Sequence, residues 1–212
     1  MRHRDATPTR LRHRAELALI GLALALMAPA WATAQSYTVV ADHSQASYSV
    51  SEKVVGLALP RDAVGVTKKV TGTITLGADG AVAEGSTVTV DLRGLTSDSG
   101  RRDRFIQNNT LDTGTYPDAV LVPTAVTGLP SPLPTSGTAS ITITGDLTVH
   151  GTTKTVSWNA TATFTAQTIT VKATTDVTFD DFGLKRPVVG PILAVSDPIH
   201  LQVDLTFQRG PS

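Results

Sequence analysis

Strict alternation of apolar and polar residues is the feature that most limits the fold of this chain. Its longest example has an apolar or small residue at every second position from Ile141 to Val149, and again from Val156 to Phe164. Because successive side chains of a β-strand point to opposite faces, this pattern predicts strands with one buried face. About eight such runs occur, separated by Gly, Pro, Asp and Asn turns. The sequence therefore predicts an all-β protein, either a sandwich or a barrel of antiparallel strands.

Two segments interrupt the alternation. Residues 99–109 contain few β-branched side chains, which favours one short helix with Ser99 as its N-cap and an end near Asn108 or Asn109. Residues 128–137 contain three prolines, which cannot donate hydrogen bonds to a strand ladder. We expect this second segment to be an exposed loop.

Charge and cysteine content exclude several classes of function. The chain carries 18 Lys and Arg residues against 18 Asp and Glu residues, whereas a dedicated nucleic-acid-binding protein normally has a basic surplus. It has no cysteine, which excludes disulfides, thiolate catalysis and cysteine-ligated metal centres. We therefore expect no nucleic-acid partner and a domain that is stable without disulfides.

Side chains that could carry catalysis or bind a metal ion are few. His43, His150 and His200 follow the N-terminal segment, and no two of them stand at a spacing typical of metal ligands. Neither a nucleophile elbow nor a phosphate-binding glycine loop occurs. We therefore assign no catalytic residue and no metal ligand. The enzymatic alternative is a polar set inside a barrel, formed by His150 with Asp146 or Asp103.

The N-terminal segment has the pattern of a secretory signal peptide. Residues 1–16 hold five arginines, residues 17–30 form an apolar run, and Ala32-Thr33-Ala34 supplies the small residues of a cleavage site. The apolar run is short for a membrane span, although an N-terminal membrane anchor is the alternative. We expect cleavage near Ala34, one domain over residues 35–212, and a periplasmic or secreted protein.

A basic cluster coincides with the expected helix. Guanidinium groups bind oxyanions in a bidentate geometry, so Arg101 and Arg104 are candidates for contacting a charged head group. Arg102 and Asp103 are interpreted as structural. The alternative is that the cluster is a structural Arg–Asp pair beside a solvated face.

The order of short motifs along the chain resembles the YceI-like family of secreted bacterial proteins, from about Tyr37 to Phe207. The motifs are Asp42-His43-Ser44, Ala46-x-Tyr48, Val70-Thr71-Gly72-Thr73-Ile74, Val88-x-Val90-Asp91-Leu92, Arg102-Asp103, Tyr116-Pro117, Gly145-Asp146-Leu147-Thr148-Val149-His150-Gly151 and Asp181-Phe182-Gly183. The resemblance implies an extended lipocalin-like antiparallel β-barrel that binds long amphiphiles in an apolar tunnel, with no catalytic residues. The chain departs from the family at Arg104-Phe105, where His-Leu is common, and over residues 52–67.

The resemblance and the apolar phase of the strands together predict the residues of a tunnel. The expected ligand-binding residues are Tyr48, Val50, Val70, Ile74, Phe105, Ile143, Leu147, Trp158, Phe164, Phe179, Leu201 and Val203. The expected head-group residues are Arg101, Arg104 and His150. Alternation cannot separate an open tunnel from a barrel whose side chains fill it completely, so both alternatives stand.

The function that follows is non-enzymatic binding, transport or storage of a polyisoprenoid or fatty-acyl lipid outside the cytoplasm. The lipid is the ligand, and no other cofactor is expected. Transient membrane contact and a homodimer are compatible with this function. The alternatives are an enzyme of calycin-like barrel type that acts on a bound lipid, and a structural β domain with a filled core.

Overall fold

The computed structural model describes residues 34–77, 79–187 and 192–211, and strands dominate them. Nearly all of the expected signal peptide lies outside these residues. The ten strands are β1 (Gln35–Val39), β2 (Gln45–Val54), β3 (Arg61–Thr67), β4 (Val70–Leu76), β5 (Thr87–Asp91), β6 (Asp118–Thr127), β7 (Gly137–Val149), β8 (Thr152–Phe164), β9 (Thr168–Val177) and β10 (Ile192–Arg209). Every pairing between them is antiparallel.

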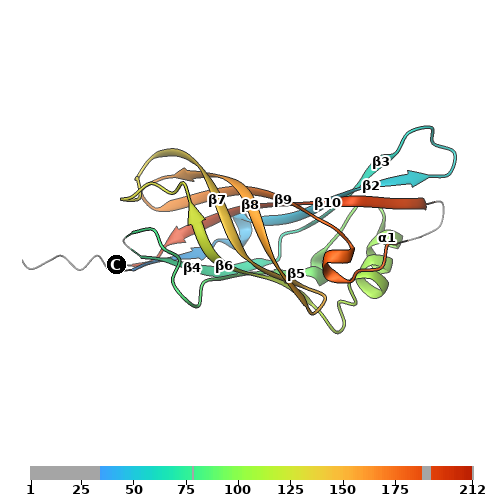
Figure 1. Cartoon of the computed structure of the whole chain (residues 1–212), viewed down its shortest axis with the longest axis horizontal. Helices are drawn as coiled ribbons and strands as arrows, with labels where there is room; N and C mark the ends of the chain where they lie inside the picture. Colours follow the sequence, from blue (N-terminus) through green and yellow to red (C-terminus); the bar gives the residue numbers. More distant parts are fainter. Residues whose placement is uncertain (1–33, 78, 188–191, 212) are drawn as a thin grey trace, which may run out of the picture. The chain divides into compact units, whose positions relative to one another are not determined.

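Eight of these strands close into a barrel (Figure 1). Strand β1 pairs with β4, the chain then runs through β5 to β10 in order, and β10 returns to β1. The closing register joins Tyr37 to Arg209 and Val39 to Phe207. The predicted all-β, lipocalin-like antiparallel barrel of about eight strands is therefore confirmed.

Strands β2 and β3 form a hairpin that the alternation alone does not place. Strand β10 is 18 residues long, so it pairs with β1 near its C-terminus and with β2 along the rest of its length. Strand β3 pairs with β2 and ends the sheet. The hairpin therefore extends the wall beyond the closed part of the barrel (Figure 1).

The wall passes from β1 to β2 through a short 3-10 turn, η1 (Ala41–His43). Ser44, which is buried, links the two sides of this seam. Its hydroxyl donates to the carbonyl of Val40 at 2.8 Å and accepts from the N–H of Thr206 at 3.1 Å. The Val40 N–H also donates to the Thr206 carbonyl at 2.8 Å. Strand β10 is thus hydrogen-bonded to the chain across the whole passage.

The expected short helix is present as α1 (Gly100–Phe105), followed by a π turn, η3 (Ile106–Thr110). The predicted N-cap is also confirmed, because the Ser99 hydroxyl accepts from the N–H of Arg102 at 3.4 Å. Two 3-10 turns, η2 (Leu92–Gly94) and η4 (Asp180–Phe182), complete the helical segments of the described residues. None of the described helices is long and apolar enough to cross a bilayer.

The alternation places one face of each strand inside the barrel. On β8, Trp158, Ala160, Ala162 and Phe164 are buried, while the residues between them are exposed. The three-proline segment lies between the end of β6 and the start of β7, as expected for a loop. The core is therefore the barrel interior.

Candidate functional site

Side chains do not fill the barrel completely, because the interior holds two apolar cavities. The larger has a volume of about 180 Å³ and reaches η3, η4 and the segment that follows η4, including Ile106, Leu111 and Leu184. The smaller has a volume of about 90 Å³ and reaches β1 and the loop after β6, including Tyr37 and Leu129. We call the end with α1, η3 and η4 the helical end. Five side chains line both cavities: Val88, Leu121, Trp158, Val203 and Leu205.

Most of the residues predicted to bind a ligand line these cavities. The cavity-lining members of that prediction are Tyr48, Val50, Ile74, Ile143, Leu147, Trp158, Phe179, Leu201 and Val203. Val70, Phe105 and Phe164 line neither cavity. Val70 and Phe164 are buried in packed parts of the core, and Phe105 is half-buried on α1. Contact of any of these residues with a ligand stays a prediction.

Two buried polar atoms on the cavity wall have no partner among the described residues. The indole Nε1 of Trp158 and the hydroxyl of Thr110 make no hydrogen bond, although both side chains line the larger cavity. An indole N–H can only donate, and a buried donor without an acceptor costs about 1–3 kcal/mol. A guest molecule that supplies an oxygen at these points would remove that cost.

A buried ion-pair network lies beside the larger cavity. Glu52 on β2 is 1% exposed, and its Oε1 accepts from Arg102 Nη2 at 2.9 Å and from Arg61 Nε at 2.8 Å. Arg102 also pairs with Asp98. Asp103 instead accepts a hydrogen bond from the Ser97 hydroxyl at 2.5 Å. The structural role expected for Arg102 thus rests on Glu52 and Asp98, and Asp103 is held separately.

Glu52 was missed by the sequence analysis, although a signal for it exists. It has the same parity on β2 as Ala46, Tyr48 and Val50, which line the cavity. An acid on the apolar face of a strand requires a buried cation, because an isolated buried carboxylate is strongly disfavoured. The basic cluster of the helix supplies that cation.

Tyr48 connects the ion-pair network to the cavity. Burial raises the pKa of Tyr48 to about 12, in spite of the opposing effect of the nearby Arg102 charge. Its phenol therefore stays protonated and able to donate. The ring packs so closely on β3 that a Cβ at Gly65 would lie 2.3 Å from Tyr48 Cε1. The glycine at position 65 thus leaves the space that this ring occupies.

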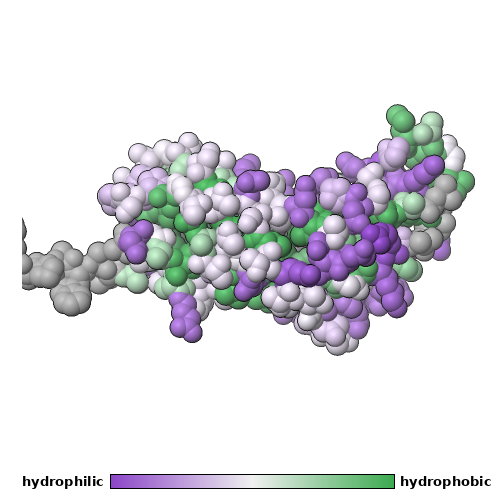
Figure 2. Space-filling model, viewed as in Figure 1, coloured by the Kyte–Doolittle hydropathy of each residue, from purple (hydrophilic) through white to green (hydrophobic). Residues whose placement is uncertain are grey.

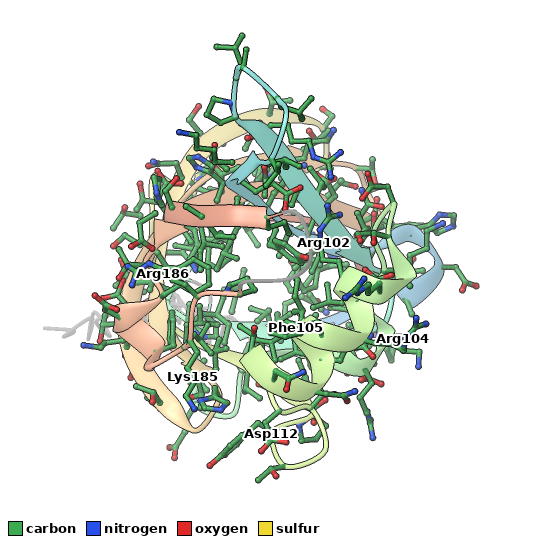
Figure 3. The ribbon with its side chains drawn as sticks, turned by 90° about the vertical axis from the view of Figure 1, so that its right-hand side faces the viewer. Arg102, Arg104, Phe105, Asp112, Lys185 and Arg186 are labelled. Carbon is green, nitrogen blue, oxygen red and sulfur yellow. The ribbon has the colours of Figure 1, made fainter. Side chains whose placement is uncertain are left out.

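The predicted head-group residues lie outside both cavities. Arg101 and Arg104 are exposed on α1, whereas Arg102 between them is buried; Figure 3 shows Arg104 on the outer side of this helix. His150 occupies the β7–β8 turn with a φ of 50°, and its ring centroid is 4.7 Å from that of Tyr116. The helix thus presents its unpaired arginines to solvent rather than to the cavity.

The polar set required by the enzymatic alternative is not assembled. Neither Asp146 nor Asp103 is hydrogen-bonded to His150; Asp146 instead accepts from Thr155 at 2.6 Å. In the described part of the chain, no group of three His, Cys, Asp or Glu side chains could hold a metal ion. The described site therefore consists of two cavities with apolar walls.

Asp181 holds the η4 turn at the helical end by hydrogen bonds to Thr178. We expect the contribution of these bonds to the stability of the protein to depend on pH. Asp181 Oδ2 accepts from the N–H and the hydroxyl of Thr178, both at 2.8 Å, and these hydrogen bonds lower the pKa of Asp181. This contribution to folding is therefore complete above the unfolded-state pKa of about 3.9 and is lost as the pH falls further. Asp181→Asn should lower the thermal midpoint at neutral pH and flatten its fall below about pH 4, as followed by circular dichroism. Equal acid slopes in the two proteins would contradict this assignment.

The fold and its interior define a class, the lipocalin-like antiparallel barrels with an apolar internal cavity. Within that class, the sequence profile of the YceI-like domain matches residues 37–207. The chain belongs to the YceI-like family, as its motifs indicated.

Several relatives that are similar in sequence come from pseudomonads. A UPF0312 protein of Pseudomonas putida is 36% identical over 118 residues, which cover 51% of this chain and 58% of the relative. A UPF0312 protein of Pseudomonas syringae pv. tomato is 28% identical over 201 residues, which cover 91% of this chain and 95% of the relative. The alignment thus spans little more than half of the first relative and nearly all of the second.

Solved structures share the fold at low sequence identity. A polyisoprenoid-binding domain from Saccharophagus degradans, implicated in plant cell wall breakdown, has a TM-score of 0.65 and 13% identity, covering 82% of this chain and 98% of the domain. BcnA of Burkholderia cenocepacia has a TM-score of 0.60 and 21% identity, covering 79% of this chain and 98% of BcnA. These likenesses concern the fold.

Proposed function

We propose that this protein binds the hydrocarbon chain of a long amphiphilic lipid inside the barrel and carries or stores that lipid outside the cytoplasm. The observation that supports this function best is the pair of adjoining apolar cavities along the barrel. The similar fold of a polyisoprenoid-binding domain favours a polyisoprenoid, with a fatty-acyl chain as the alternative cargo. The pattern of a signal peptide supports the location.

The dimensions of the interior favour a slender chain. Pockets for drug-sized ligands are typically about 300–1,000 Å³, whereas the two cavities measure about 180 and 90 Å³. Each buried CH₂ contributes about 0.8 kcal/mol. Offsetting an association cost of about 4–15 kcal/mol therefore takes about 5 to 19 buried methylenes. The affinity would come from the length of the chain in the barrel rather than from a few polar contacts.

The polar end of the lipid would lie at the helical end. Tyr48 offers a protonated phenol on the wall of the larger cavity, and Thr110 offers an unpartnered hydroxyl. Arg101 and Arg104 are exposed nearby on α1, where they can attract an anionic head group that projects into solvent. The tail would then extend past Trp158 toward the smaller cavity.

Native mass spectrometry of the protein purified from its host, followed by organic extraction, tests this function. We expect one isoprenoid or acyl species per chain, and re-uptake of such a lipid after delipidation. Val203→Phe places a ring where the two cavities adjoin and should abolish uptake. Val122→Phe adds the same ring on the outer face of β6, where the side chain is 44% exposed, and should not affect uptake. A lipid-free mass together with failure to take up prenyl or acyl lipids would refute the proposal.

A further inference from the structure

Residues 183–187, which follow η4 and which we call the strap, cover one side of the larger cavity at the helical end. Leu184 and Pro187 of the strap line this cavity, together with Phe179 and Phe182 of the preceding turn. Pro187 and both phenylalanine side chains are buried, and Leu184 is half-buried. The inner side of the strap is therefore part of the cavity wall.

The outer side of the strap is polar. Lys185 and Arg186 are exposed, and Figure 3, which looks at this end, shows both on the side opposite Arg104 of α1. Figure 2 shows hydrophilic residues gathered on the outside of the helical end. The strap therefore separates the cavity from solvent.

A single arginine attaches the strap to the barrel by its side chain. Arg186 Nη1 lies 3.4 Å from Asp180 Oδ1, and Arg186 Nη2 pairs with Asp197 on β10. The guanidinium carbon of Arg186 also lies 5.4 Å from the ring centroid of Phe179, in a cation–π contact. Asp197 in turn accepts from the Phe179 N–H at 3.0 Å. Asp197 is thus the point on the barrel wall that holds both the strap and the start of η4.

The backbone adds little to this attachment. Among the described residues, the only backbone hydrogen bond of residues 184–187 joins the Leu184 N–H to the Phe179 carbonyl at 2.9 Å. Gly183, which precedes Leu184, has a left-handed φ of 61°, and beyond its chain neighbours no atom lies within 4 Å of where its Cβ would be. Rotation of the strap about Gly183 therefore breaks one backbone hydrogen bond and meets no obstacle at that residue.

The strap is held less firmly than α1, which covers the other side of the helical end. The ion pair that anchors α1 joins Arg102 to Glu52, whose side chains are 7% and 1% exposed. The pairs of the strap are open to water, since the side chains of Arg186, Asp180 and Asp197 are 42%, 81% and 27% exposed. Exposed ion pairs stabilise little, whereas breaking a buried pair leaves an uncompensated charge. Local opening at this end is therefore easier at the strap than at α1.

We propose that the strap is the portal of the larger cavity and that the ion pairs of Arg186 hold it closed. When Arg186 leaves Asp180 and Asp197, the strap turns outward about Gly183 and opens the cavity to solvent beside η4. Arg186 thus sets the rate at which the lipid enters and leaves rather than the amount of lipid bound. This role in lipid exchange rests on the proposed lipid-binding function, but the opening of the strap does not.

Release of a bound prenyl alcohol tests the portal. The delipidated protein is loaded with geranylgeraniol and mixed with an excess of methyl-β-cyclodextrin, and the loss of the loaded mass is followed over time by native mass spectrometry. Arg186→Gln should release the alcohol about three to ten times faster than the wild type, with the same load at equilibrium. Lys185→Gln is the matched control, because it removes the same charge from an exposed neighbour that makes no salt bridge among the described residues. It should release at the wild-type rate.

A reversible cross-link tests the same movement without relying on faster release. The chain has no cysteine, so two introduced thiols are the only ones. In the variant Arg186→Cys with Asp197→Cys, a short bismaleimide that contains a cleavable disulfide joins the strap to β10. We expect the linked protein to retain its lipid, and reduction of the linker to restore release. The wild-type protein treated with the same reagent is the control.

The outcomes separate the portal from the carrier function. Release from the linked protein at the wild-type rate, or equal release rates for Arg186→Gln and Lys185→Gln, would overturn the portal and leave the carrier function standing. Hydrogen exchange of the Leu184 amide reports the opening without any lipid. If the wild type takes up no prenyl lipid, while this amide exchanges faster in Arg186→Gln than in Lys185→Gln, the carrier function fails and the opening of the strap stands.

Discussion

Trp158→Ala should join the two cavities and lower the free energy of unfolding by about 3–5 kcal/mol. The Trp158 side chain is 4% exposed and lines both cavities, so its removal leaves a large void at the point where they adjoin. The variant should therefore hold longer or bulkier lipid chains than the wild type, if it remains folded. Urea denaturation measures the stability, and native mass spectrometry of the delipidated protein with prenyl lipids of graded length measures the capacity.

Trp158→Phe serves as the control for this experiment. It keeps a large ring between the cavities but removes the indole N–H that has no partner. Its capacity should stay close to that of the wild type, because the partition remains. If Trp158→Ala leaves the range of bound chain lengths unchanged, the cavities are not limited by this side chain, and the proposed path of the tail is wrong.

Glu52→Ala should destabilise the protein by about 3–5 kcal/mol, because it removes the buried partner of the buried Arg102 charge and leaves only the exposed Asp98. The side chains of Glu52 and Arg102 are 1% and 7% exposed, so water cannot replace the missing carboxylate. Asp91→Ala removes a half-buried carboxylate that pairs with the exposed Arg93 and accepts the Arg93 N–H as the N-cap of η2, and it should cost about 1–2 kcal/mol. Chemical denaturation compares the two variants.

The double variant Glu52→Met with Arg102→Met distinguishes charge burial from simple loss of packing. Two apolar side chains of similar length need no partner, so much of the stability lost in Glu52→Ala should return. A Glu52→Ala loss no larger than that of Asp91→Ala would mean that the network does not hold α1 on the barrel.

The alternation predicted the strands because that constraint is local, whereas their closure into a barrel was predicted by the family resemblance. Each long run of alternation, such as that from Ile141 to Val149, specifies a strand and its inner face without reference to the rest of the chain. The helix was equally local, since Ser99 caps a segment that lacks alternation. The β2–β3 hairpin could not be placed in this way, because its position depends on the length of β10 and on the strand at which the barrel closes.

The sequence predicted which strand residues face the barrel interior, but it could not predict where along the barrel the cavities lie. Val203 and Phe164 both lie on inner faces, yet only Val203 lines a cavity, because the packing of neighbouring strands decides where space remains. The sequence pattern also could not predict which side of the short helix faces the barrel. Six residues give too few turns to reveal that Arg102 turns inward while Arg101 and Arg104 turn outward.

The seam at Ser44 determines how cargo can move. The hydroxyl of Ser44 and the backbone of Val40 continue the hydrogen bonding to β10 from β1 to β2, so among the described residues this seam is closed. If the proposed lipid occupies the barrel, this seam closes one lateral route, and we expect the lipid to enter and leave through an end of the barrel. The time needed for its release should then increase with the length of the tail, because the whole tail has to leave through one opening.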